Sequence, residues 1–175
     1  DAVSFTGSHK VGKKVFEQAS LSQKRVQTEM GGKNPAVVMP SADIKEAAQI
    51  VADGAFGVTG QACTATSRAI VHEDIYEEFL NDIKNIAEDI EIGPGIEDPD
   101  MGPKASEEEL ENTMNYIEIG MEEGAVLEYG GNKLTSGKYS SGYYVEPTIF
   151  SDVEPEMTIA QEEIFGPVLA VMKVS

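Results

Sequence analysis

The stretch Ala36-Val37-Val38-Met39 is short and apolar, and Pro40 closes it, as expected for a buried strand. A segment with helical periodicity follows, and either Ser41 or Asp43 is suited to cap it. The apolar face of this helix is predicted to hold Ile44, Ala47, Ala48, Val51 and Ala55. A second apolar strand, Ala69-Ile70-Val71, comes next. Because strand, helix and strand in this order are typical of parallel sheets, the stretch predicts an α/β fold.

The same alternation extends toward both ends of the chain. Further helices are predicted over 11–20, 74–90 and 106–123, and further strands over 25–28, 125–129, 144–149 and 168–174. Ser106 and Glu109 form a capping box at the start of the last helix. The inward stripe of this helix is predicted to be Leu110, Met114, Ile117 and Met121. We therefore predict a three-layer α/β domain with a mainly parallel sheet flanked by helices.

Composition and charge exclude several classes of partner. The 175 residues include 13 basic and 31 acidic side chains, which gives a formal net charge of −18. Such a surface repels nucleic acid and anionic membranes. It is typical of a solvated acidic surface, and it also fits adaptation to high salt, where screening relieves self-repulsion. No stretch approaches the roughly 20 apolar residues of a membrane span. The single cysteine cannot form an intramolecular disulfide, so we expect a cytoplasmic protein.

That cysteine lies in Gly60-Gln61-Ala62-Cys63-Thr64-Ala65-Thr66-Ser67-Arg68, where small neighbours leave the thiol open to a substrate. A thiolate attacks an aldehyde carbonyl to give a thiohemiacetal, from which a hydride can leave to a nicotinamide. Taken alone, a free cysteine is more often a small buried hydrophobe. Gln61 is expected to shape this loop, and Arg68 to orient it rather than to bind a substrate carboxylate.

A candidate base lies upstream in Glu29-Met30-Gly31-Gly32-Lys33-Asn34-Pro35. Hydrolysis of a thioester needs a base that activates water, and the two glycines allow close backbone approach. A single glutamate among 31 acidic residues is more often a solvated charge, so Glu29 alone leaves both interpretations open. Lys33 is expected to close the turn or to pair locally.

Two further segments can contact a dinucleotide. In Phe5-Thr6-Gly7-Ser8, which precedes a helical segment, Gly7 and Ser8 can present N–H groups and a hydroxyl to a pyrophosphate, although an ordinary helix cap has the same residues. Near the end of the chain stands Gln161-Glu162-Glu163-Ile164-Phe165-Gly166-Pro167, in which Phe165 alone is equally compatible with a core position. The paired carboxylates do not predict a metal site, because no ligand spacing recurs around the two histidines.

Together these motifs resemble the NAD(P)-dependent aldehyde dehydrogenase superfamily. The resemblance rests on residues 5–8, 29–33, 60–68, 142–148 and 162–168. It implies that Cys63 is the nucleophile and Glu29 the general base. It further implies that Gly7 and Ser8 lie against the dinucleotide, that Glu163 binds the nicotinamide ribose hydroxyls and that Phe165 packs beside that ribose and the ring.

The resemblance implies oxidation of a small-molecule aldehyde to its carboxylic acid with NAD or NADP as cofactor. It also implies a homo-oligomer, dimeric or tetrameric. Residues 56–63 look most like members that oxidise semialdehydes carrying a carboxylate, such as 2-oxoglutarate semialdehyde. The pair His9-Lys10 stands where the family often has Thr-Glu, and it leaves the choice between NAD and NADP open.

Family members are much longer than this chain, so we expect a piece of a longer protein. Residues 1–34 are then a C-terminal remnant of the dinucleotide-binding domain, and residues 35–175 are the thiol-bearing catalytic domain. The piece alone is expected to be inactive, because the family's oxyanion asparagine lies outside it. Two alternatives remain: a non-catalytic fragment that retains only fold and assembly surface, and an acylating enzyme that transfers the acyl group to coenzyme A. Glu29 argues against the latter, since that branch generally lacks the base.

Overall fold

In the computed structural model, which describes all of residues 1–175, the chain divides into two units, Asp1–Gly32 and Lys33–Ser175. The first unit consists of strand β1 (Ala2–Gly7), helix α1 (His9–Leu21) and strand β2 (Arg25–Met30). The two strands are parallel, with Thr6 opposite Glu29 and Gly7 opposite Met30. Ser8 caps α1 through its hydroxyl, which accepts a hydrogen bond from the Val11 amide at 3.4 Å.

The second unit is built on a five-stranded sheet in the order β3-β4-β9-β8-β5. Four of these strands run parallel, and β5 pairs antiparallel with β8 at one edge. The strands are β3 (Asn34–Val38), β4 (Thr66–His72), β5 (Val126–Tyr129), β8 (Thr148–Ser151) and β9 (Val168–Val174). The helices are α2 (Ile44–Phe56), α3 (Tyr76–Asp89), α4 (Glu107–Glu122) and α5 (Thr158–Gln161). Two short strands, β6 (Lys133–Leu134) and β7 (Tyr144–Val145), form a separate hairpin.

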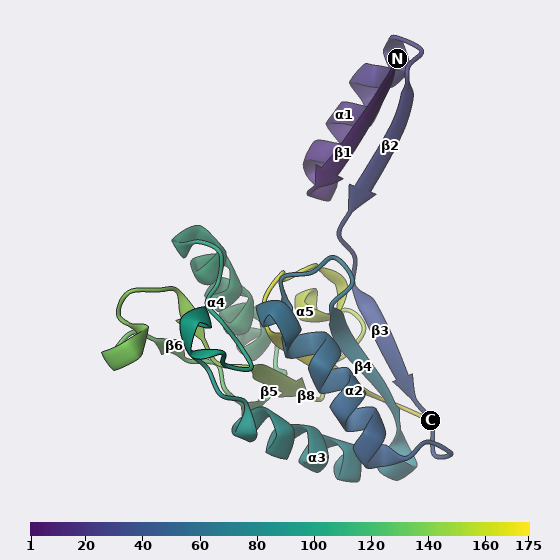
Figure 1. Ribbon diagram of the computed structural model, residues 1–175. Coiled ribbons are helices and arrows are strands. Elements are labelled where there is room, and N and C mark those ends of the chain that lie inside the picture. Colours follow the sequence, from purple (N-terminus) through teal and green to yellow (C-terminus); the bar gives the residue numbers. More distant parts are fainter. The chain divides into compact units, whose positions relative to one another are not determined.

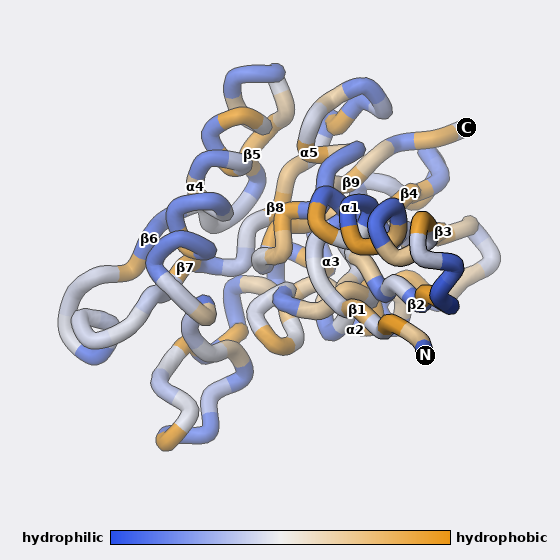
Figure 2. Tube along the Cα trace, turned by 90° about the horizontal axis from the view of Figure 1, so that it is seen from above, coloured by the Kyte–Doolittle hydropathy of each residue, from blue (hydrophilic) through white to orange (hydrophobic).

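Helices cover both faces of this sheet, which confirms the predicted three-layer α/β fold. Leu169 and Val171 of β9 pack with α2 and α3, which lie side by side (Figure 1), whereas Val168 and Ala170 pack with α4 and α5. This alternation is the period of two that a strand buried on both faces requires. In Figure 2 the segment around β8 is largely hydrophobic and the outer turns of α4 are hydrophilic. None of the helices combines the length and apolar character that a membrane crossing needs.

Short 3-10 turns complete the second unit. They are η1 (Gly57–Gly60) after α2, η2 (Glu73–Ile75) before α3, η3 (Gly95–Glu97) and η4 (Gly137–Tyr139). One expectation about the strands was wrong: residues 144–149 are not one strand but two, β7 and β8, with Pro147 between them. Proline lacks the N–H that a ladder position uses, so the chain leaves one sheet there and enters the other.

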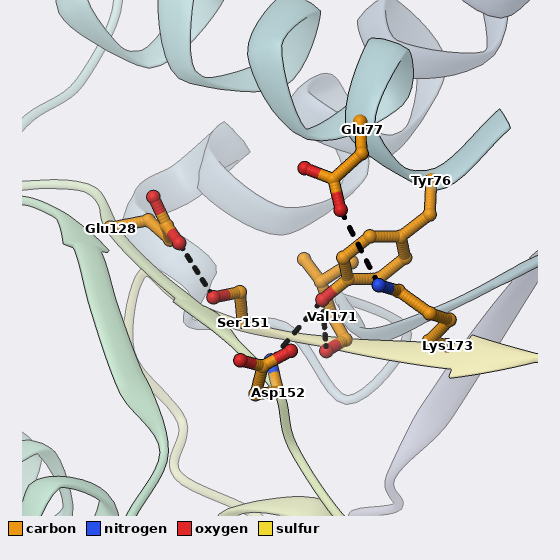
Figure 3. A network of polar contacts seen from close by, with 7 residues as sticks. All are labelled: Tyr76, Glu77, Glu128, Ser151, Asp152, Val171 and Lys173. Carbon is orange, nitrogen blue, oxygen red and sulfur yellow. Dashed lines mark hydrogen bonds and ion pairs between the residues drawn. The ribbon is translucent and has the colours of Figure 1, made fainter. Parts of the chain in front are cut away.

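A polar network fixes the start of α3 to the sheet (Figure 3). The Tyr76 hydroxyl accepts a hydrogen bond from the Asp152 amide at 3.2 Å and donates one to the Val171 carbonyl at 3.5 Å. Lys173 of β9 lies 4.2 Å from the centre of the Tyr76 ring, and its ammonium lies 3.3 Å from Glu77. These contacts join α3, the residue after β8 and the carboxyl-terminal part of β9, which is the end of the sheet opposite to the loops that precede β4 and β9.

Candidate active site

Three of the predicted site residues, Gly7, Ser8 and Glu29, belong to the first unit. Gly7 ends β1 and Ser8 caps α1, while Glu29 lies one residue before the end of the neighbouring parallel strand β2. The structure therefore brings all three to the carboxyl edge of the strand pair, where open parallel sheets bind ligands. The Glu29 side chain is exposed, and its Oε1 accepts a hydrogen bond from Gln27 Nε2 at 3.1 Å.

The other three, Cys63, Glu163 and Phe165, belong to the second unit. Cys63 is exposed and lies in the segment made of η1 and the residues that lead to β4, here called the cysteine loop (residues 57–65). The loop begins with two non-glycine residues in the left-handed region, Val58 (φ 53°) and Thr59 (φ 59°). Such backbone is costly, and it persists only where surrounding contacts hold it.

Asn34 fixes the part of the cysteine loop that carries Cys63. Its side-chain amide donates to the carbonyl of Cys63 at 2.8 Å and to the carbonyl of Ala65 at 3.0 Å. Asn34 is the first residue of β3, and its single planar amide thereby fixes the backbone on both sides of Thr64. The nucleophile candidate is thus exposed at its side chain but anchored at its backbone, a combination that suits a group that must meet a substrate in a defined geometry.

The residues around Phe165 form the second loop of the site, here called the cofactor segment (residues 162–167), which follows α5. Phe165 has φ 54° and leaves 38% of its surface exposed, although Ile164 and Gly166 on either side are buried. Glu163 is half-buried. Its neighbour Glu162 instead accepts a hydrogen bond from the Tyr116 hydroxyl at 2.7 Å. Burial and this bond raise the pKa of Tyr116 to about 12.

The cysteine loop and the cofactor segment touch through glycines. A Cβ on Gly60, whose φ is +64°, would lie 2.2 Å from the Gly166 carbonyl oxygen. A Cβ on Gly166 would lie 2.6 Å from Thr113 Oγ1 of α4. A residue with a Cβ could not be accommodated at either position, so the two glycines allow the backbones of the cysteine loop and the cofactor segment to come this close. Cys63 and the Glu163–Phe165 pair are therefore carried by loops in direct contact.

Two cations lie behind the cysteine loop. Arg68 Nη2 donates to the Lys33 carbonyl at 2.7 Å, so Arg68 joins the start of β4 to the residue before β3, and the role in orienting the cysteine loop stays a prediction. Lys33 Nζ and Arg68 Nε are buried without a hydrogen-bond partner. Burial, followed by the nearby Arg68 charge, lowers the pKa of Lys33 to about 8, against the opposing effect of the Glu163 carboxylate. This net positive environment favours anionic groups at the site.

Sequence reasoning missed the residues that hold these loops. Asn34 was noted only as part of a boundary, and Lys104, which donates to the Phe165 carbonyl, was not singled out. A polar residue directly before Pro35 was the only local signal for Asn34. Gln61 does shape the loop as expected, since it bonds to the Ala105 amide at 2.8 Å. No cluster of three or more His, Cys, Asp and Glu side chains is arranged to hold a metal ion.

Comparison with known proteins identifies the family. The sequence profile described as "Aldehyde dehydrogenase family" matches residues 1–175. The chain belongs to the aldehyde dehydrogenase family. It is 56% identical over 175 residues to an alpha-ketoglutarate semialdehyde dehydrogenase of Haloferax volcanii, covering 100% of this chain and 36% of that protein. It is 54% identical to the alpha-ketoglutaric semialdehyde dehydrogenase of Bacillus subtilis, covering 99% of this chain and 36% of the other. The chain thus spans about a third of the length of these aldehyde dehydrogenases.

Solved aldehyde dehydrogenases share the fold. An NAD+ complex of the Bacillus cereus aldehyde dehydrogenase matches with a TM-score of 0.94 at 39% identity, over 100% of this chain and 35% of that one. The betaine aldehyde dehydrogenase of Staphylococcus aureus, in complex with NAD+, matches with a TM-score of 0.96 at 32% identity over the same shares. The α/β architecture described above is therefore that of part of an aldehyde dehydrogenase.

Proposed function

We propose that a protein carrying this chain oxidises an aldehyde to its carboxylic acid with NAD or NADP as the hydride acceptor, and that Cys63 is its nucleophile. The observation that carries the proposal is the exposed Cys63 side chain on a loop whose backbone is fixed by Asn34 and packed against the cofactor segment. Membership of the aldehyde dehydrogenase family supports the same chemistry.

In the first step the Cys63 thiolate forms a bond to the carbonyl carbon of the aldehyde, and the oxygen takes the negative charge of a thiohemiacetal. The hydride on that carbon then leaves, and the carbonyl re-forms as a thioester on Cys63. The positive charges of Lys33 and Arg68 favour the developing oxyanion. A rigid cysteine loop contributes because the carbonyl must meet the sulfur in one orientation.

The cofactor, when bound, supplies the acceptor of that hydride. Glu163 and Phe165 are the residues proposed to hold its ribose and ring, because an exposed aromatic side chain beside a half-buried carboxylate fits an apolar ring and a pair of hydroxyls. Gly7 and Ser8 are proposed to contact its phosphates. The first turn of α1 contains no acidic residue, so the N-terminus of this 13-residue helix favours an anion. Residues 1–34 are accordingly proposed to be the remnant of a dinucleotide-binding domain.

Glu29 is proposed to complete the cycle as the general base. It takes a proton from water, the resulting hydroxide adds to the thioester carbon, and the carboxylic acid leaves as the thiolate re-forms. Its exposure at the carboxyl edge of β2 leaves the carboxylate open to water. The balance is one aldehyde, one NAD(P)+ and one water converted to one acid, one NAD(P)H and one proton.

A semialdehyde with a carboxylate at its far end is the proposed substrate class, with 2-oxoglutarate semialdehyde as the first candidate. The names of the Haloferax volcanii and Bacillus subtilis relatives, together with a Saccharolobus solfataricus 2,5-dioxopentanoate dehydrogenase at 46% identity, support this choice. The positive environment of Lys33 and Arg68 fits a substrate with an anionic end. A homo-oligomeric assembly is proposed for the complete protein on the family resemblance alone.

A chimera tests the proposal. The chain replaces the corresponding 175 residues of the Haloferax volcanii relative, which it matches along its whole length. We expect NADH or NADPH formation from 2-oxoglutarate semialdehyde, and a loss of at least about 10³-fold in kcat on Cys63→Ser. An active Cys63→Ser chimera would show that Cys63 is not the nucleophile. Turnover by the 175-residue chain alone, in contrast, would contradict the expectation that it is an inactive piece.

A further inference from the structure

Lys104 is a buried lysine that the proposed chemistry does not use. It is 2% exposed, its ammonium donates to the carbonyl of Phe165, and its backbone amide donates to the Tyr143 carbonyl at 2.7 Å. Lysine is almost never fully buried unless it is paired, because its charge loses hydration. Burial lowers the pKa of Lys104 to about 8, while the Glu109 carboxylate acts in the opposite direction. A lysine that is buried despite this loss of hydration needs a specific partner, and the partner of the Lys104 ammonium is the Phe165 carbonyl.

That carbonyl belongs to the strained residue of the cofactor segment. Phe165 is a bulky residue with φ 54°, and its ring stands 38% exposed. Left-handed backbone is unfavourable at such a residue, so surrounding contacts must stabilise it. The Lys104 ammonium is a charge-assisted donor, which is the stronger kind of hydrogen bond. It therefore stabilises the backbone orientation that turns the Phe165 ring outward.

The residues on both sides of Lys104 hold the cysteine loop. Thr59 Oγ1 donates to the Gly102 carbonyl at 3.0 Å, and Gln61 Nε2 donates to the Pro103 carbonyl at 3.3 Å. The Ala105 amide donates to Gln61 Oε1 at 2.8 Å. Residues 102–105, here called the strap, thus contact the cysteine loop through three side-chain hydrogen bonds and the cofactor segment through Lys104. The cysteine loop and the cofactor segment also contact each other directly, at Gly60 and Gly166.

We infer that Lys104 is a positioning residue: through the Phe165 carbonyl it keeps the cofactor segment in register with the cysteine loop, so that the two loops move as one. The inference rests on the proposed function in one respect: the placement of Glu163 and Phe165 relative to Cys63 matters for catalysis only if these residues have the roles proposed above. The mechanical coupling itself is a property of the 175-residue chain and can be measured without cofactor or substrate.

Amide hydrogen exchange on the 175-residue chain tests the coupling. Lys104→Met removes the donor, and Lys104→Gln, which has nearly the same size as methionine, retains an N–H. Lys138→Met is the control, because it removes a lysine charge from a partly exposed surface position. We expect exchange of peptides covering 162–168 and 59–65 to rise at least about tenfold in Lys104→Met, with α3 amides unchanged. Lys104→Gln should restore most of the protection, and Lys138→Met should match the wild type.

Two results would overturn the inference. One is faster exchange confined to the cofactor segment, which would mean that the loops are not coupled. The other is an equal rise throughout α3, which would mean that Lys104 supports only global stability. If Lys104→Met does not fold, Gln61→Met carries the test, because it releases the strap from the cysteine loop: faster exchange at 162–168 supports the coupling, and unchanged exchange there overturns it. Titration of the wild-type chain with NADH reports separately on the proposed function, and absence of binding leaves the exchange result valid.

Discussion

At the scale of single residues, the exposed Cys63 lies on a loop whose backbone is held by a residue distant in the sequence, Asn34 of β3. Cys63 is distinguished by being the only cysteine and by its small neighbours. Asn34, which fixes the loop of Cys63, lies 29 positions away, and its place before Pro35 is the only local signal for it. Its role follows from the parallel pairing of β3 with β4, a tertiary relation that periodicity does not specify. The same holds for Lys104, whose partner is 61 positions away.

Replacement of Asn34 by alanine should destabilise the chain. The variant leaves the carbonyls of Cys63 and Ala65 without their donor, and an unsatisfied polar group costs about 1–3 kcal/mol. Urea denaturation of Asn34→Ala should show this loss in the free energy of unfolding. Asn81→Ala, at an exposed position of α3, is the control and should change it by less than about 0.5 kcal/mol. Equal stability of Asn34→Ala and wild type would mean that the two hydrogen bonds do not anchor the loop.

At the scale of elements, regular periodicity gave good predictions and short interrupted segments gave poor ones. The strand predicted over 168–174 is β9 at the same bounds, and the Ser106 cap of α4 is confirmed by its 3.2 Å bond from the Glu109 amide. Within α4, Leu110 and Ile117 are buried as predicted, but Met121 is 47% exposed. The inward face of the last turn of α4 is occupied by Gly120, which packs against Ile159 and Phe150, so the next residue, Met121, lies outside that face.

The meeting of η1 with the cofactor segment gives a prediction about glycine. Gly60→Ala places a Cβ at φ +64° against the Gly166 carbonyl, so strain and a backbone clash both oppose it. We expect a loss of at least about 2 kcal/mol in the free energy of unfolding. Gly57→Ala is a matched control three residues earlier in the same turn, with nothing within 4 Å of its Cβ and an ordinary φ of −52°. If both alanine variants behaved alike in thermal denaturation, the close contact between the loops would be refuted.

At the scale of the whole molecule, the buried lysines make the free energy of unfolding depend on pH. Burial lowers the pKa of Lys104 to about 8, whereas the unfolded chain keeps the usual value of 10.5. Between these values the unfolded state binds more protons, so Lys104 makes the free energy of unfolding rise with pH, by at most about 1.4 kcal/mol per unit. Lys33, whose pKa is also lowered to about 8, adds a rise of the same sign that remains when Lys104 is replaced. The measurement is urea denaturation between about pH 8 and 9, below the pKa of 10.0 that Tyr116 has in the unfolded chain. Lys104→Met should flatten the rise, and an identical slope in the variant would contradict the assignment.

The net charge of −18 makes the stability of the folded chain depend on salt concentration. Self-repulsion of exposed carboxylates opposes the compact state, and at 1 M salt the screening length falls to about 3 Å. We propose that the surface is adapted to high salt, and we expect the urea midpoint to rise with KCl. A triple variant, Glu108→Gln, Glu118→Gln and Glu122→Gln, removes three exposed charges of α4 and should be less dependent on salt. A midpoint independent of KCl in both proteins would argue for an ordinary solvated surface.

The most direct test of the proposed roles of Cys63 and Glu29 is to trap the acyl group. In the Haloferax volcanii chimera, Glu29→Gln should allow hydride loss but slow hydrolysis of the thioester. After reaction with NAD+ and the semialdehyde, acid quenching and peptide mass mapping should show close to one acyl group per chain, on Cys63. The group should be absent when Cys63→Ser is added. Acylation of another residue, or wild-type turnover of Glu29→Gln with no trapped thioester, would contradict the roles proposed for both residues.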